Sequence, residues 1–105
     1  MEYQRYYLIL RRPSMRTGLL SLAETALQAG VHPELIERMT DLGLIEPEQT
    51  SPELLFAPAV VADVRRAWRL RNELGVNWAG VGLVMDLLEQ VRKLEKELLI
   101  IKGEQ

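Results

Sequence analysis

Residues 21–43 read SLAETALQAGVHPELIERMTDLG, which is the pattern of two short helices joined by a tight turn. The opening serine, with a glutamate three positions later, forms the S-x-x-E signal of a capped helix start. Gly30 stands where a left-handed glycine ends a helix, and Pro33 suits the first position of the next one. The first helix is expected over residues 19–28. Together these signals predict a helix-turn-helix unit over residues 22–42.

Short strands and two further helices are expected on either side of this unit. The β-forming run at residues 6–10 and the LLF stretch at 54–56 predict strands that can pair with each other. Pro58 opens a third helix, and Asn77 caps a last helix that runs to the C-terminal end. The predicted division is a core over residues 1–76, a dimerisation helix over 77–102 and a frayed tail at 103–105.

Apolar residues at helical spacing mark the buried faces of these helices. Ile36 and Met39 share one face of the second helix, and Val64 and Trp68 share one face of the third. Trp78, at the start of the last helix, is predicted to pack in the core, with an interface anchor as the alternative. The sequence therefore predicts one small core built mainly from helices.

Composition excludes several classes of function. The chain has 105 residues, 48% apolar and 27% charged, which is typical of a single globular domain. It has no cysteine, and His32, its single histidine, precedes a proline in a predicted turn. No GxSxG, P-loop or HExxH pattern occurs, so we expect no catalytic site, no metal site and no cofactor. The apolar run at residues 6–10 is too short for a signal or a membrane span, which favours a soluble cytoplasmic protein without a membrane partner.

The last helix carries an apolar seam with the 3, 4, 3, 4, 3 spacing of a heptad repeat. The seam consists of Val84, Leu87, Val91, Leu94, Leu98 and Ile101. Each of these side chains, left in water, forgoes roughly 1.5–3 kcal/mol of burial, so something must cover them. The helix either folds back on its own domain or pairs with a second copy; its length favours the homodimer. Whether the paired helices run parallel or antiparallel is not determined by the sequence.

The charge of the helix-turn-helix region argues against DNA as its ligand. Residues 23–55 hold seven acidic side chains against Arg38 alone, a net charge of −6, whereas the whole chain carries −2. DNA affinity comes largely from cations that neutralise phosphates, so an acidic recognition helix would be repelled. An acidic protein-binding surface is favoured, formed by Glu34, Glu37, Asp41, Glu46 and Glu48. DNA binding remains a minority alternative, because the arginines of the third helix could contact phosphate: Arg65, Arg66, Arg69 and Arg71.

Separate stretches of the chain resemble one known family. Residues 69–81 read RLRNELGVNWAGV, similar to the R-L-R-x-E-L segment, short turn, Trp and Gly-aliphatic pair of the chaperone-modulator CbpM family. Residues 43–47, GLIEP, fit that family's G-[LV]-[LIV]-E-P, and Phe56 followed by a helix with a Val-Val pair agrees too. The resemblance covers roughly residues 19–100.

The resemblance implies a mostly α-helical fold: a MerR-like winged helix-turn-helix core with a short two-stranded β element and a C-terminal coiled-coil helix. It also implies binding to the J-domain of a DnaJ-type, CbpA-like co-chaperone, and inhibition of that co-chaperone's stimulation of Hsp70. J-domains present a basic helix, which an acidic surface would mask by charge complementarity. The alternative is a MerR-type DNA-binding transcriptional regulator. Such regulators usually carry an Arg-Tyr-Tyr type recognition helix and wing tyrosines, whereas this chain has IERM at 36–39 and LLF at 54–56.

Overall fold

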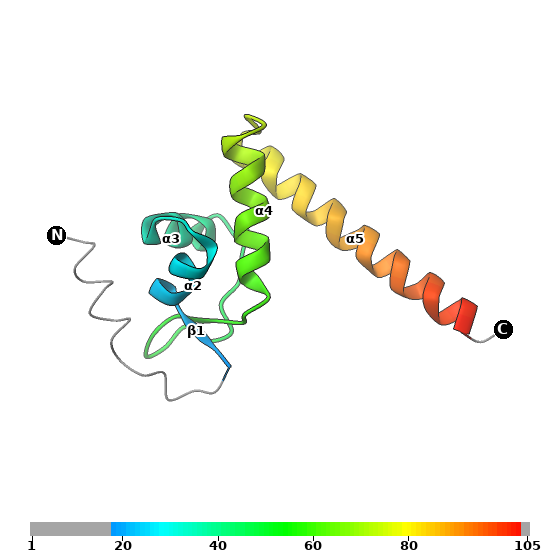
Figure 1. The fold of residues 1–105 in the computed structure, drawn as a ribbon, viewed down its shortest axis with the longest axis horizontal. Helices are drawn as coiled ribbons and strands as arrows, with labels where there is room; N and C mark the ends of the chain where they lie inside the picture. The colour runs from blue at the N-terminus through cyan, green and yellow to red at the C-terminus, as the bar shows by residue number, and fades with distance from the viewer. Residues whose placement is uncertain (1–17, 104–105) are drawn as a thin grey trace.

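The computed structural model describes residues 18–103, which form a small helical body and one long projecting helix (Figure 1). The elements are β1 (Leu20–Ser21), α2 (Leu22–Ala29), α3 (Pro33–Asp41), β2 (Leu55–Phe56), α4 (Val60–Asn72) and α5 (Trp78–Gly103). The first two helices and the strands gather on one side of α4, and α5 leaves the far end of α4 and extends away from the body. This arrangement gives the chain principal extents of 56 × 35 × 21 Å.

The helix-turn-helix forms as its capping signals predict. The hydroxyl of Ser21 accepts the Glu24 N–H at 3.0 Å, and the Glu24 carboxylate accepts the Ser21 N–H at 2.9 Å, which completes a capping box. Gly30 ends α2 with a φ of +73°, a conformation that glycine adopts without steric penalty. His32, predicted as a plain turn residue, has a structural role: its Nδ1 accepts the Glu34 N–H at 3.0 Å and so caps α3.

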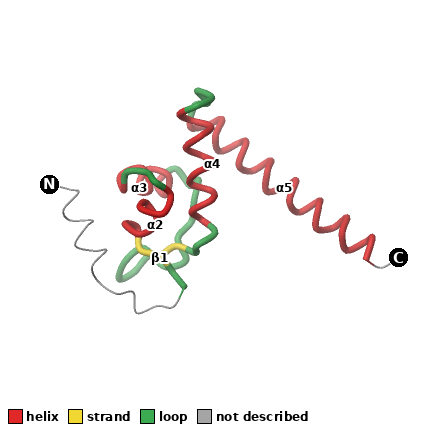
Figure 2. The backbone as a smooth tube through the Cα atoms, in the orientation of Figure 1, coloured by secondary structure: helices red, strands yellow, loops and turns green. Residues whose placement is uncertain are grey.

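The strands pair differently from the sequence-based expectation. Leu55–Phe56 pairs antiparallel with Leu20–Ser21, a dipeptide that was predicted to lie within the first helix (Figure 2). The helix begins at Leu22, three residues later than the predicted start at residue 19, because Ser21 closes the strand and caps α2 at the same time. Gln49 and Leu55 exchange backbone hydrogen bonds, which folds the loop before β2 into a small wing. The strand predicted at residues 6–10 lies outside the described residues.

A compact core joins the helices and β2. Ile36, Met39, Phe56 and Val64 are fully buried, as is Val81, through which α5 is anchored to the body. Trp68 and Trp78 are half-buried and pack against this cluster. The apolar faces predicted for the second and third helices are therefore confirmed, with both tryptophans at the edge of the core.

The turn between α4 and α5 is tightly packed around a glycine. The side-chain oxygen of Asn77 accepts the Gly80 N–H at 2.8 Å and caps α5, as predicted. A Cβ added at Gly80 would lie 2.7 Å from Cγ1 of Val76 and 3.3 Å from the same Asn77 oxygen. An added Cβ would therefore force Val76 or the turn to shift.

Replacing two nearby glycines of α5 by alanine is expected to change stability in opposite directions. Gly80→Ala should lower the free energy of unfolding by roughly 1–2 kcal/mol, because the added methyl forces the turn apart. Gly82→Ala serves as the matched control, since its Cβ would lie 3.4 Å from a terminal methyl of Leu44, an ordinary contact. It should gain up to about 1 kcal/mol from helix propensity. Urea unfolding measures both values; equal stabilities would contradict the steric role of Gly80.

Candidate protein-interaction surfaces

One side of α3 is buried and the opposite side is charged. Ile36 and Met39 point into the core with no exposed surface. At 100° per residue, the charged side chains of this helix all fall on the other side, within about 100° of one another. We call Glu34, Glu37 and Asp41 the acidic face; Arg38 lies among them. Glu34 and Asp41 are exposed and Glu37 is half-buried, so three of the five predicted binding residues come together on one helix.

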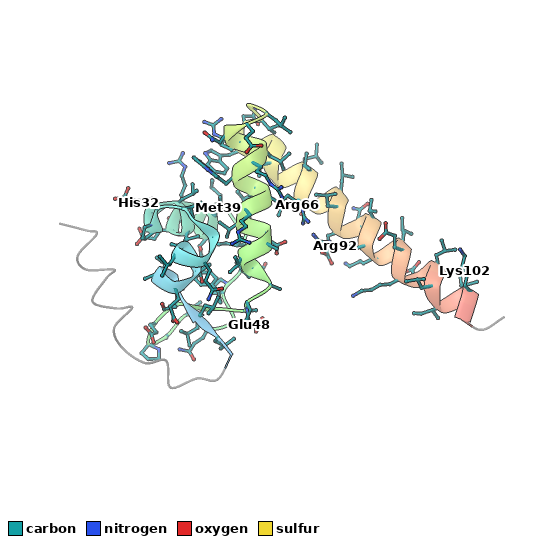
Figure 3. The ribbon with its side chains drawn as sticks, in the orientation of Figure 1. His32, Met39, Glu48, Arg66, Arg92 and Lys102 are labelled. Carbon is teal, nitrogen blue, oxygen red and sulfur yellow. The ribbon has the colours of Figure 1, made fainter. Side chains whose placement is uncertain are left out.

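The other two predicted residues lie elsewhere. Glu46 follows the turn after α3 and lines a cleft against α4 and α5, together with Asp63 and Arg92. Glu48 lies at the base of the wing, where its N–H donates to the Leu55 carbonyl at 2.8 Å. Figure 3 shows Glu48 near the first turn of α4, well separated from His32 at the start of α3. The five acidic residues thus form one helical face and two isolated loop positions.

The apolar seam of α5 faces away from the body. Val81 and Met85, which pack against the core, lie on one side of the helix, and at 100° per residue the centre of the seam lies about 130° around the helix from them. Five seam residues are about half exposed or more: Leu87 50%, Val91 48%, Leu94 63%, Leu98 52% and Ile101 56%. Val84, next to the body, is half-buried. The helix does not fold back on its own domain, so the body does not cover the exposed apolar residues of the seam.

Three of the four α4 arginines have partners within the chain. Arg65 donates a hydrogen bond to the carbonyl of Gln28 in the last turn of α2. Arg66 lies 3.8 Å from Asp63, which also lies 3.9 Å from Arg92 of α5. The Arg71 guanidinium stands 5.4 Å above the centroid of the Trp78 ring, within cation–π range. These contacts brace α2 and α5 against α4, a role that the sequence left undetermined.

Trp68 forms the floor of a surface groove that the sequence did not indicate. Two adjoining hollows share this side chain, one toward the helix-turn-helix and one along α4. We call their combined lining the Trp68 groove: Ala29, Gly30, Val31, His32, Glu34, Leu35, Arg38, Ala62, Arg65, Arg66, Trp68 and Arg69. Helical spacing predicts only that Trp68 lies in the core. Periodicity indicates which side of a helix is buried, and it does not reveal a groove on the surface beside that side.

Comparison with known proteins identifies the family. The model of the MerR HTH family regulatory protein matches residues 20–102. The chaperone modulatory protein CbpM of Citrobacter koseri is 35% identical over 82 residues, which cover 77% of this chain and 81% of that protein. The protein of the same name from Salmonella paratyphi B is 34% identical over the same shares of both chains. The chain belongs to the CbpM family. Neither family description names an enzyme.

The CbpM signature coincides with the junction of α4 and α5. Residues 69–81, which carried the resemblance, supply the Arg71–Trp78 contact and the Asn77 cap of α5. They also supply the Gly80 position at which no Cβ fits. In this CbpM-family chain the signature therefore specifies the direction in which α5 leaves the body, and the mostly helical MerR-like fold is confirmed.

Two further properties concern the described part of the chain. Between residues 18 and 103, no group of three or more His, Asp or Glu side chains is placed to hold a metal ion. None of the helices in that range is long and apolar enough to cross a membrane.

Proposed function

We propose that this CbpM-family protein is a homodimeric chaperone modulator. It binds the J-domain of a DnaJ-type, CbpA-like co-chaperone and so inhibits that co-chaperone's stimulation of Hsp70. The name of its relatives, chaperone modulatory protein, supports the modulator role. The binding mode is inferred from the charge and exposure of surfaces on this chain.

The acidic face of α3 carries the proposal. In a helix-turn-helix that reads DNA, the second helix enters the major groove. Here that helix presents Glu34, Glu37 and Asp41 against Arg38 alone, so it would approach phosphate with a net negative charge. The same face complements a basic helix such as a J-domain presents, and charge complementarity of this kind speeds association and selects the partner. The charge of α3 therefore favours binding of a protein over the DNA binding of a MerR-type transcriptional regulator.

The α5 seam supports the homodimer. Its exposed side chains, from Leu87 to Ile101, extend along about four turns of the projecting part of the helix, where a second α5 can approach them. Fully burying each one stabilises the assembly by roughly 1.5–3 kcal/mol. A heptad seam complements a copy of itself, which makes a second chain the natural occupant.

The proposed function predicts a measurable loss of Hsp70 stimulation. Adding the protein to Hsp70 and a DnaJ-type co-chaperone should lower the stimulated ATPase rate toward the basal rate, because the J-domain is occupied. The inhibition should saturate near one protomer per J-domain. Steady-state ATPase assays measure the rate, and calorimetry measures the complex.

A matched control separates masking of the co-chaperone from an effect on Hsp70 itself. The basal ATPase rate of Hsp70 without co-chaperone should not change on addition of the protein. Absence of both a complex and inhibition would contradict the proposal. Sequence-specific DNA affinity that survives near-physiological salt in a gel shift would support the transcriptional regulator instead.

A further inference from the structure

The Trp68 groove has the opposite charge to the rest of the protein. Its lining includes four arginines, Arg38, Arg65, Arg66 and Arg69, against Glu34 as the single carboxylate among the described lining residues. This gives the groove a net charge of +3 in a chain whose net charge is −2. A local reversal of charge over a hollow surface attracts an oppositely charged ligand and repels the partners of the surrounding acidic surface.

The floor of the groove is apolar, and its side chains are fixed by packing against the core. Val31, Leu35 and Trp68 are each half-buried, and all three pack against the buried core cluster. Their outer surfaces stay accessible while their inner surfaces are fixed. Binding a ligand therefore carries little entropic cost for ordering these side chains. Such a preorganised apolar floor can accept a bulky apolar side chain of the ligand as an anchor.

The arginines at the rim differ in how available they are. Arg65 already hydrogen-bonds the Gln28 carbonyl, and Arg66 lies beside Asp63. Arg38 and Arg69 are exposed, and neither guanidinium has a hydrogen bond or ion pair within the described range 18–103. The cations that remain for a ligand therefore stand one on α3 and one on α4, on either side of Trp68.

We propose that the Trp68 groove is a docking site for an acidic peptide segment of a partner protein, anchored by a pair of bulky apolar side chains. The apolar pair lies on Trp68 and Leu35, and flanking carboxylates pair with Arg38 and Arg69. The groove lies on the Leu35 edge of α3 and adjoins the acidic face proposed above to bind the J-domain, with Glu34 belonging to both. Glu37 and Asp41 point toward the other edge at 100° per residue.

Other occupants fit the groove less well. A nucleic acid would bring one phosphate per nucleotide past the neighbouring acidic face, where Glu37 and Asp41 would repel it. The N-terminal stretch of this chain carries Arg5, Arg11, Arg12 and Arg16, which would add like charge to the groove. A short acidic segment meets the cations without extending over the acidic face.

The test uses the full chain and a synthetic probe. The probe is a fluorescein-labelled peptide with a central Leu-Phe pair flanked on both sides by aspartate and glutamate, and its binding is followed by fluorescence anisotropy at low ionic strength. Arg38→Glu and Arg69→Glu should each weaken binding by about tenfold or more, because each replaces an attractive pair by a repulsive one. Lys96→Glu, the same charge change on exposed α5, should alter the affinity by less than about twofold.

A spectroscopic readout locates the probe on the protein. The chain has two tryptophans, so a ¹H–¹⁵N spectrum contains two indole N–H signals. The signal of Trp68 should shift on titration with the peptide while that of Trp78, under Arg71, stays in place. Replacing the Leu-Phe pair of the probe by Ala-Ala should weaken binding by about tenfold or more, because the anchor is lost.

Three results would overturn the proposal. The first is equal binding of the Leu-Phe and Ala-Ala peptides, which would show attraction by charge alone. The second is an unmoved Trp68 indole signal at saturation, which would place the peptide elsewhere. The third is a duplex DNA that displaces the peptide and depends on the same two arginines, which would identify the groove as a phosphate-binding surface.

Discussion

A Leu94→Asp variant is expected to sediment as a monomer at concentrations where the wild-type chain sediments as a dimer. Leu94 is 63% exposed in the single chain and lies close to the middle of the seam, so it enters the interface in either orientation of the helices. The substitution removes roughly 1.5–3 kcal/mol of burial per protomer and places an unpaired carboxylate between apolar side chains. With two copies per dimer, the dissociation constant should rise by about 100-fold or more.

Ile100→Asp is the matched control for this variant. Ile100 is also 63% exposed, but at 100° per residue it lies about 150° around the helix from the centre of the seam. The same introduction of charge there should leave the dimer largely intact. Sedimentation equilibrium distinguishes the outcomes: equal dissociation of both variants would contradict the seam, and a monomeric wild type would contradict the dimer outright.

The second large effect is expected from charge reversal on the acidic face. The double variant Glu37→Lys with Asp41→Lys should weaken binding of a J-domain by roughly tenfold for each reversed residue at low salt, because each attraction becomes a repulsion. Raising the ionic strength should reduce the difference in J-domain affinity between the wild type and the variant, because at 0.15 M exposed charges are screened over about 8 Å. Calorimetry across a salt series measures both effects.

Asp41 allows binding to be separated from stability. It is the last residue of α3, where a positive charge interacts favourably with the helix dipole, so Asp41→Lys alone should leave the fold as stable or slightly more stable. Glu73→Lys is the control, because Glu73 caps the C-terminal end of α4 and receives the same charge change on another surface. If J-domain affinity is indifferent to Glu37 and Asp41, the acidic face is not the contact, whatever the partner.

Features that depend on neighbours along the chain were predictable from the sequence. The capping pair of Ser21 and Glu24, the left-handed Gly30 and the Asn77 cap all form at their predicted positions. Each depends on residues two to four positions apart, so the pattern in the sequence contains the whole interaction. The heptad spacing likewise predicted a continuous α5 with an apolar seam, because helical periodicity alone defines the side on which the seam lies. Leu99 and Ile100 are exposed apolar residues outside that seam.

Features that depend on distant contacts were not predictable in this way. Leu20–Ser21 becomes a strand because Leu55–Phe56, more than thirty residues later, provides its hydrogen-bonding partner. The Arg65–Gln28 hydrogen bond spans 37 residues. The Trp68 groove exists because the helix-turn-helix and α4 pack at one particular angle, and nothing in the local pattern of either segment specifies that angle. For the same reason, five acidic residues close in sequence separated into one face and two loop positions.

The projection of α5 from the body has a consequence for how strongly partners are held. A helix of 26 residues is about 39 Å long, so in an antiparallel pair of α5 helices this length would set the spacing between the two bodies. A partner with a single docking helix gains nothing from the second body. A partner with two such helices at a matching spacing binds the second one at a high effective concentration, and its avidity exceeds the affinity of either contact. The length of α5 would then discriminate between monomeric and dimeric co-chaperones without any change at the binding surface.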